Sequence, residues 1–200
     1  MNLPFSQACE NNKQPIYEQL ASIFSQKQHI LEIGSGTGQH ACFFANNLSH
    51  LIWQSSDQPA YLADLNCRIE QAKLTNLPLA LPLDVAAPNS AITQQKFDGI
   101  YSANTLHIMS KPLVEKFFSL VGSITQTGAS LVIYGPFNYQ GRYTSDSNRD
   151  FDQWLLARDP LSAIRDIEWI TSLAEQQGFT LQQDFALPAN NRLLHFIATR

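Results

Sequence analysis

The stretch from Ile30 to His40, which reads ILEIGSGTGQH, decides the fold of this 200-residue chain. An apolar run ends in a turn with glycine at every second position, Gly34, Gly36 and Gly38, and an apolar periodicity typical of a helix follows at once. Glycine lacks a Cβ and adopts positive φ, so the backbone of such a turn can lie directly against a ligand. A strand, a glycine turn and a helix in this order indicate an α/β fold with a nucleotide-like ligand at the turn.

The spacing of the glycines separates two classes of ligand. A dinucleotide fingerprint has its third glycine five positions after the first, and Gln39 stands there instead, so an NAD-dependent oxidoreductase is disfavoured. An acidic residue, Glu32, precedes the turn by two positions. This pattern resembles motif I of the class I S-adenosylmethionine (SAM) methyltransferases, which implies that the glycines pass beneath the amino-acid part of SAM. The resemblance also implies that Glu32 organises the turn and the SAM ammonium. The alternative is a tight turn without a ligand, for which three glycines would be an entropic cost without a use.

Composition and charge limit the classes of function. The length predicts a single domain over 1–200 that buries roughly 70% of its unfolded surface. The net charge is −4, and no cluster of five or more Lys and Arg occurs, which disfavours a nucleic-acid partner. No apolar run approaches the roughly 20 residues of a membrane span, and the first residues lack a secretion signal, so we expect a cytoplasmic protein. The three cysteines are far apart, which favours reduced thiols and predicts no metal site. Nothing in the sequence predicts an oligomeric state.

Strand and helix patterns alternate along the chain. Strands are expected over 29–33, 51–55, 77–83, 97–103, 131–134, 179–185 and 193–198. Helices are expected over 14–26, 38–48, 58–73, from Pro112 onward and over 161–177. The last two strands are joined too closely for a crossover helix and should be antiparallel. This order predicts a Rossmann-like, seven-stranded and mostly parallel sheet with one antiparallel edge strand and helices on both faces.

Two segments fall outside this alternation of strands and helices. Residues 1–28 are expected to form an N-terminal helix or lid. Residues 135–160 are rich in Asn, Ser, Gly, Arg and Tyr and show little periodicity until Phe151 to Leu156. A long irregular stretch in a compact domain is more often functional than idle, so we expect a substrate-side insertion there.

Two carboxylates follow successive expected strands. Asp57 lies 19 residues after Gly38, where it is placed to accept hydrogen bonds from both ribose hydroxyls. The alternative is that it caps the following helix. Asp84 ends the third expected strand, where the methyltransferase resemblance implies a contact with the adenine amino group. The alternative for Asp84 is a turn residue that caps its own loop.

The segment after the fourth strand lies where methyl donor and acceptor should meet. His107 is a candidate general base near neutral pH, and the alternative is a structural histidine in the pocket wall. Asn104 is expected to touch the cofactor or its lid. The segment lacks the Asn-Pro-Pro-Tyr motif of methyltransferases that act on exocyclic amines, which disfavours DNA adenine or glutamine as acceptors. Tyr134, at the end of the fifth strand, is a second candidate proton acceptor.

Six segments together resemble the uncharacterised methyltransferase-like 26 family, also called domain of unknown function 938. They are residues 6–13, 32–40, 103–108, 134–137, 141–148 and 188–191. The resemblance spans nearly the whole chain. It implies the class I methyltransferase fold and SAM, with S-adenosylhomocysteine (SAH) as product, and it brings no established substrate.

Uncommon polar segments predict where the ligands bind. Asn12 and Lys13, taken to precede the first helix, are expected to fold over the cofactor, with Lys13 at the SAM carboxylate. A second group is expected to line a pocket for a small polar acceptor, an anion included. This group is Tyr134, Arg142, Tyr143, Asn148, Asn190 and Asn191. The alternative is that Asn148 is a cap residue and Arg142 is solvated.

These observations predict an enzyme, a SAM-dependent methyltransferase with a small-molecule acceptor. Methyl transfer from a sulfonium depends mainly on positioning and electrostatics, so no catalytic triad is needed. The alternative is a regulatory module that binds SAM or SAH without methyl transfer.

Overall fold

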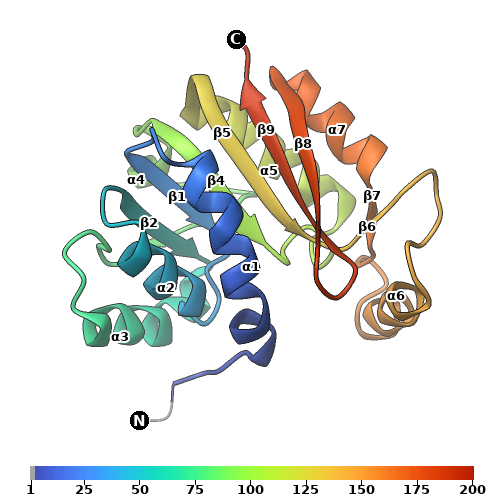
Figure 1. Ribbon diagram of the computed structural model, residues 1–200, viewed down its shortest axis with the longest axis horizontal. Coiled ribbons are helices and arrows are strands. Elements are labelled where there is room, and N and C mark those ends of the chain that lie inside the picture. The colour runs from blue at the N-terminus through green and yellow to red at the C-terminus, as the bar shows by residue number, and fades with distance from the viewer. Residues whose placement is uncertain (1–2) are drawn as a thin grey trace.

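The computed structural model describes residues 3–200, built around one large sheet (Figure 1). Its strands are β1 (His29–Ile33), β2 (Ile52–Asp57), β3 (Leu81–Pro82), β4 (Phe97–Ala103), β5 (Thr125–Gly135), β8 (Phe179–Leu187) and β9 (Asn191–Ala198). They lie in the order β3-β2-β1-β4-β5-β9-β8. β1 to β5 are parallel, and β9 runs antiparallel to both of its neighbours, next to the edge strand β8. The expected seven-stranded, mostly parallel sheet is confirmed.

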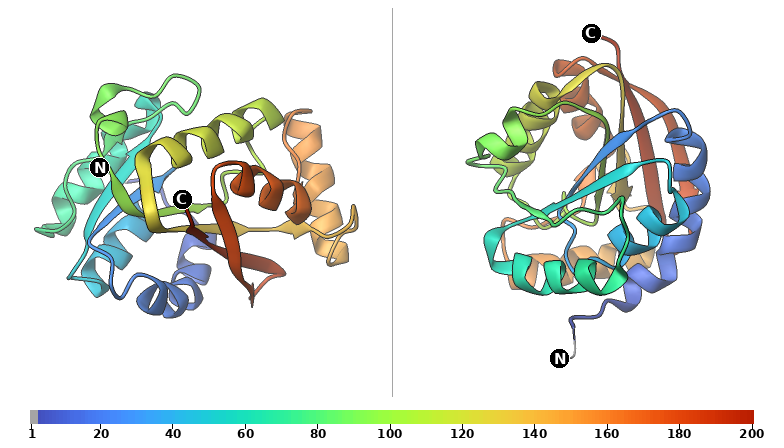
Figure 2. Two further views of the ribbon diagram at one scale, coloured as in Figure 1. Left: turned by 90° about the horizontal axis from the view of Figure 1, so that it is seen from above. Right: turned by 90° about the vertical axis from the view of Figure 1, so that its left-hand side faces the viewer.

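Helices cover both faces of this sheet (Figure 2). One face carries α1 (Gln7–Ile23), α2 (Gln39–Asn47) and α3 (Leu62–Ala72), and a 3-10 turn (Pro59–Tyr61) precedes α3. The other face carries α4 (Ser90–Thr93), α5 (Lys111–Ile124) and α7 (Ile167–Gln176). Two short strands, β6 (Phe137–Asn138) and β7 (Arg165–Asp166), pair separately, and α6 (Asp146–Arg158) follows β6. None of the helices within residues 3–200 combines the length and the apolar character that crossing a membrane requires.

Each face of the sheet has its own apolar core. Trp53, Phe44 and Tyr101 pack together beneath α1–α3, with ring centroids 5.4–5.7 Å apart. Phe117 and Phe118 of α5 are buried against the opposite face. A fully buried side chain of this kind contributes roughly 1.5–3 kcal/mol, so the two cores hold the strand ends in fixed positions.

The N-terminal helix begins earlier than its apolar periodicity predicts. The Ser6 Oγ accepts a hydrogen bond from the Cys9 N–H at 3.3 Å and caps the start of α1 at Gln7. The helical expectation over 14–26 was too late because the first turns of α1 are mostly polar and the buried positions begin at Ile16. Asn12 and Lys13 therefore lie within α1, not before it.

Two further expectations differ from the structure. The third strand is shorter than 77–83, because proline lacks the N–H that continues a ladder and Pro78 and Pro82 lie in that range. The stretch 135–160 is less irregular than expected, since it contains the 13-residue helix α6. The Ser145 Oγ caps this helix by accepting from the Asn148 N–H at 3.1 Å.

Candidate functional site

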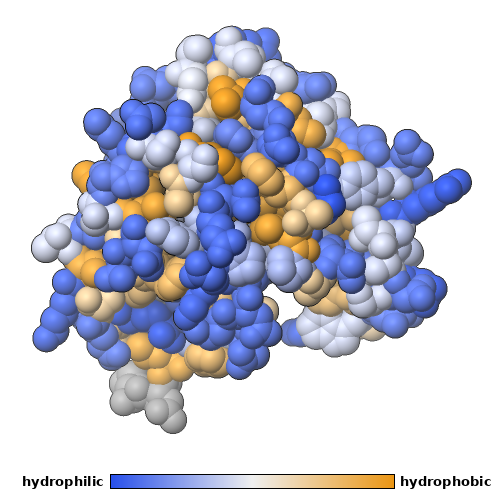
Figure 3. All heavy atoms as spheres, in the orientation of Figure 1, coloured by the Kyte–Doolittle hydropathy of each residue, from blue (hydrophilic) through white to orange (hydrophobic). Residues whose placement is uncertain are grey.

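A cavity of about 880 Å³ opens at the carboxyl ends of the parallel strands. The ends of β1, β2 and β4 reach it through Ile33, Asp57 and Ala103. α1 lines one side and α6 another, and Figure 3 shows the surface hollowed between the regions over these two helices. Ligands of open α/β sheets bind at this edge, so the cavity is the candidate site.

The glycine turn forms part of the cavity wall. Gly36 has φ +54°, and a Cβ built on it would meet no heavy atom within 4 Å. Gly34 also lines the cavity, but a Cβ there would lie 2.5 Å from the Thr105 Cγ2. Gly38 lies outside the cavity and packs against Leu65 of α3. Gly36 is therefore the position where the backbone faces open space, and Gly34 and Gly38 permit close packing.

Asp57 ends β2 and holds the glycine turn. Its Oδ2 accepts a hydrogen bond from the Gly36 N–H at 2.6 Å, and its Oδ1 accepts from the Gln58 N–H at 2.7 Å. Burial raises the pKa of the Asp57 carboxyl, and these two N–H donors oppose that rise. Neither the 3-10 turn nor α3 has a side-chain N-cap, so the structure gives no support to the capping alternative.

Glu32 lies buried at the floor of the cavity. Its Oε2 accepts a hydrogen bond from the Trp53 Nε1 at 3.0 Å. Burial raises the pKa of the Glu32 carboxyl to about 7, although the bonds from Trp53 and Ser35 favour the ionised form. A buried carboxylate with spare acceptor sites is suited to a cationic ligand group.

Asn12 lines the cavity from α1, and its amide has a fixed orientation. The His40 Nε2 lies 2.7 Å from the Asn12 Oδ1, and the Tyr101 hydroxyl lies 3.2 Å from the His40 Nδ1. Burial lowers the pKa of His40 to about 4, so the ring is neutral at neutral pH. With this arrangement Nε2 donates to the Asn12 oxygen and Nδ1 accepts from the tyrosine. The Asn12 amide nitrogen then acts as a donor toward the Tyr134 hydroxyl.

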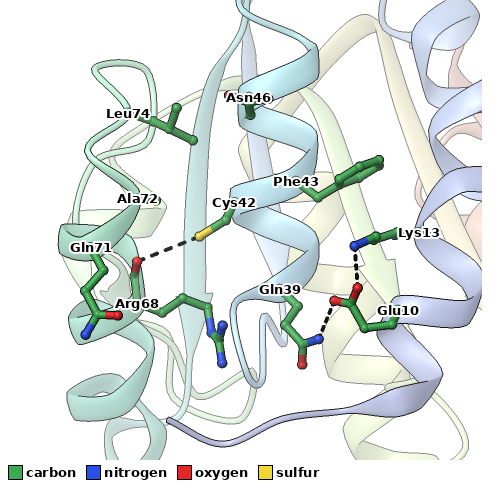
Figure 4. Close-up of a pocket in the computed structure, with 10 residues that line it drawn as sticks. All are labelled: Glu10, Lys13, Gln39, Cys42, Phe43, Asn46, Arg68, Gln71, Ala72 and Leu74. Atoms are coloured by element: carbon green, nitrogen blue, oxygen red, sulfur yellow. Dashed lines mark hydrogen bonds and ion pairs between the residues drawn. The ribbon is translucent and has the colours of Figure 1, made fainter. Parts of the chain in front are cut away.

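Lys13 points away from the cavity into a separate groove of about 460 Å³ between α1, α2 and α3 (Figure 4). Its ammonium pairs with Glu10 and lies 5.0 Å from the ring centroid of Phe43. Gln39 joins this cluster, since its amide donates to the Glu10 Oε1 at 2.6 Å. The structure thus does not bring Lys13 to the site where a SAM carboxylate was expected.

The loop after β4 carries His107 and Asn104 along the cavity. Asn104 has φ +57°, and its N–H donates to the Tyr134 carbonyl at 2.8 Å. Burial and the nearby positive charge of Arg165 lower the pKa of His107 to about 4. Arg165 also holds the loop, because its Nε donates to the Leu106 carbonyl at 3.2 Å and its guanidinium reaches the Met109 carbonyl.

The predicted acceptor residues divide into two groups. Asn148 of α6 and Asn191 at the start of β9 line the cavity. Asn190, at the hairpin tip, supports them from outside, because its carbonyl accepts from the Asn148 Nδ2 at 3.1 Å. Arg142 is exposed and does not line the cavity, which agrees with the alternative that its side chain is solvated.

The two tyrosines that were expected to line the acceptor pocket also lie outside the cavity lining. The Tyr143 hydroxyl donates to the Asp152 Oδ2 at 2.7 Å and ties the loop to α6. Tyr134 is buried at the end of β5, with its hydroxyl against the side chains of Asn12 and Asn191. Burial raises the pKa of Tyr134, so its hydroxyl stays protonated and supports the two amides.

Asp84 is exposed and lies apart from the cavity, which is lined instead by its neighbours Leu83 and Val85. Its Oδ1 accepts from the Ala86 N–H at 2.8 Å, as expected of a turn residue. The expected adenine contact of Asp84 therefore has no support in this geometry.

Sequence reasoning missed the aromatic part of the cavity wall. Phe151 and Trp154 of α6 line the cavity, and the Phe151 ring meets His107 edge-on with centroids 5.3 Å apart. A signal existed, because Asn148, Phe151 and Leu155 are spaced i, i+3 and i+7 and share one helical face. The periodicity of Phe151 to Leu156 was not assigned to a cavity wall, because residues 135–160 were expected to be an irregular insertion.

The chain matches a known protein family over almost its whole length. Residues 3–198 match the family described as "Protein of unknown function (DUF938)". The chain belongs to the DUF938 family. The resemblance drawn from the six sequence segments is confirmed.

Solved structures share the fold of this DUF938 protein at low sequence identity. An O-methyltransferase family protein from Burkholderia thailandensis matches with TM-score 0.82 and 14% identity, over 96% of this chain and 57% of its own. Human N-acetylserotonin methyltransferase, solved with SAM, matches with TM-score 0.78 and 12% identity, over 97% and 53%. PigF, solved with SAH, matches with TM-score 0.78 and 13% identity, over 94% and 56%. The DUF938 chain therefore has the class I methyltransferase fold and spans about half the length of these structures.

Proposed function

We propose that this protein transfers a methyl group from SAM to a small polar acceptor. The observation that carries the proposal is the cavity over Gly36, where an acid-flanked glycine turn leaves its backbone open at the carboxyl edge of the sheet. Proteins of the same fold have been solved with SAM or SAH bound, which supports this cofactor.

The cofactor end of the cavity is assigned to Gly34, Gly36, Glu32 and Asp57. The free acceptor capacity of the Asp57 carboxylate suits ribose hydroxyls, because each of its oxygens has a second lone-pair site beyond the bonds to Gly36 and Gln58. Glu32 supplies negative charge near the SAM ammonium. Asn104 closes this end from the loop after β4.

The reaction needs a nucleophile in line with the methyl carbon, at roughly 3–3.5 Å. When bound, SAM would supply an electrophilic methyl group, and the electrons of its S–C bond would stay on sulfur. A lone pair on the acceptor forms the new bond, and the acceptor proton passes to His107 or to water. His107 is suited to this role by its place in the cavity lining, where its pKa of about 4 keeps the ring neutral and makes it a weak base.

The acceptor end is assigned to His107, Asn12, Asn148 and Asn191. Arg142 and Lys13 do not line the cavity, so an anionic acceptor gains no support from either. Tyr134 keeps a supporting role, since it lies behind Asn12 and Asn191.

Incubation with methyl-labelled SAM and a fractionated small-molecule extract tests the proposal. We expect label in a new small molecule with the wild-type protein, and a rate about 10²–10⁴-fold lower with His107→Ala if His107 is the base. His50→Ala is the matched control, because His50 is an exposed histidine outside the cavity lining. Saturable SAH binding without a labelled product from any fraction would overturn methyl transfer and favour a SAM-binding regulatory module.

A further inference from the structure

The cavity has two ends that differ in charge. Both of its lining carboxylates, Glu32 and Asp57, stand at the ends of β1 and β2. The other end is formed by α6, the β8–β9 hairpin tip and His107 of the loop after β4.

No charged side chain within residues 3–200 lines the end of the cavity beside α6. No lysine or arginine is found among the described residues that line the cavity. His107 is neutral because burial and Arg165 hold its pKa at about 4. Asp152 does not line the cavity. Its Oδ1 accepts a hydrogen bond from the Ile164 N–H, and its Oδ2 accepts one from the Tyr143 hydroxyl. A cation here would be repelled by the sulfonium of SAM, and an anion would lose its hydration without a Lys or Arg of the lining to pair with.

Aromatic rings form one wall of this end. The Phe151 ring meets His107 at an interplanar angle of 80° with centroids 5.3 Å apart. Trp154 stacks on Phe151 at 19°, with centroids 5.7 Å apart. Trp154 also lines the cavity although half of its surface is exposed. Rings arranged in this way present faces and edges that pack best against another flat ring.

The hydrogen bonds of the Asn148 side chain determine that its amide oxygen is the atom available to a ligand. Its side chain is buried, and its Nδ2 donates to the Thr144 Oγ1 at 2.9 Å and to the Asn190 carbonyl at 3.1 Å. Both amide hydrogens are therefore in use. Among residues 3–200, no side chain or backbone group donates to the Asn148 Oδ1, which is left to accept a hydrogen bond from a ligand.

We propose that the acceptor is an uncharged, flat ring compound that carries an N–H or O–H donor, and that the Asn148 Oδ1 accepts a hydrogen bond from that donor. The ring lies against the wall formed by His107, Phe151 and Trp154. This inference rests on the proposed function, because it concerns the second substrate of the same cavity.

Small probes that bind to the SAH-loaded protein test each part of the proposal. Benzamide is flat, uncharged and a donor; benzoate is flat but anionic; acetophenone is flat but lacks a donor; cyclohexanecarboxamide has the donor but is not flat. Dissociation constants are measured by saturation-transfer NMR with SAH present at a saturating concentration. We expect benzamide to bind about threefold to tenfold more tightly than acetophenone, the value of one hydrogen bond, and to exceed the other two probes as well.

Asn148→Ala should remove the preference for benzamide over acetophenone and leave SAH affinity unchanged. Asn47→Ala is the matched control, because Asn47 is an exposed helical asparagine whose amide also donates to a backbone carbonyl. Equal or tighter binding of benzoate or cyclohexanecarboxamide, an unchanged preference in Asn148→Ala, or no binding of any probe would overturn the inference. Failure of SAH itself to bind would instead count against the proposed function.

Discussion

Replacement of Gly36 by alanine tests whether the open face of the glycine turn is where the cofactor lies. Gly36 has φ +54°, and the added methyl would meet no protein atom within 4 Å. The folded protein should therefore lose only the cost of a left-handed backbone at a non-glycine residue, about 1–2 kcal/mol. For a chain of this size that corresponds to a decrease of roughly 2–8 °C in Tm.

The same methyl would project into the space assigned to SAM. Forcing an extra methyl into a packed contact costs about 1–3 kcal/mol, so the dissociation constant for SAH should rise by roughly fivefold to 150-fold. Isothermal titration calorimetry measures this change directly.

Gly128→Ala is the matched control for this substitution. Gly128 has φ +84°, meets nothing within 4 Å and is exposed outside the cavity lining. Both variants should lose similar thermal stability, but only Gly36→Ala should lose SAH affinity. Unchanged SAH binding in Gly36→Ala, or an equal loss in both variants, would refute the assignment of the turn to the cofactor.

Three further predictions concern the carboxylates near the turn. Asp57→Ala should weaken SAH binding by about tenfold to a hundredfold, because charged hydrogen bonds contribute roughly 1.5–3 kcal/mol; an unchanged affinity in calorimetry would exclude a ribose contact. Asp84→Ala should leave SAH affinity within about twofold, since its side chain is exposed and serves a turn; a large loss would restore the adenine contact. Burial raises the pKa of Glu32 to about 7 in the folded protein from 4.5, so its neutral form stabilises the fold at low pH and this stability is lost as pH rises through about 7. The Tm of Glu32→Gln should therefore fall less than the wild-type Tm between about pH 5 and pH 8. Identical Tm-against-pH profiles for the two proteins would show that the pKa of Glu32 is not raised by folding.

Local chemistry accounts for the parts of this molecule that the sequence predicted well. The glycine turn, β1 and β4 follow from apolar runs and glycine spacing, which act over a few residues. Asp57 was predicted from its place after the second strand, and its bond to the Gly36 N–H agrees with that position. The resemblance to DUF938 extended these local signals to the whole chain.

Tertiary context accounts for the parts that the sequence did not predict. Lys13 carries a charge suited to the SAM carboxylate, but its position on α1 directs it to Glu10 and Phe43 in a separate groove. Arg142 was grouped with Asn148 because the two are close in sequence, yet Arg142 is exposed before α6 begins, whereas Asn148 lies in the first turn of α6 and lines the cavity. The direction in which a side chain points depends on how its helix packs against the rest of the protein. The spacing of residues along the chain does not determine that packing.

A crystal structure of the protein with SAH tests the central claim most directly. We predict SAH in the cavity over Gly36, with its ribose hydroxyls within hydrogen-bond distance of the Asp57 carboxylate and its sulfur facing His107. SAH bound elsewhere, such as in the groove beside Lys13, or a cavity that stays free of SAH at saturating concentration, would contradict the account.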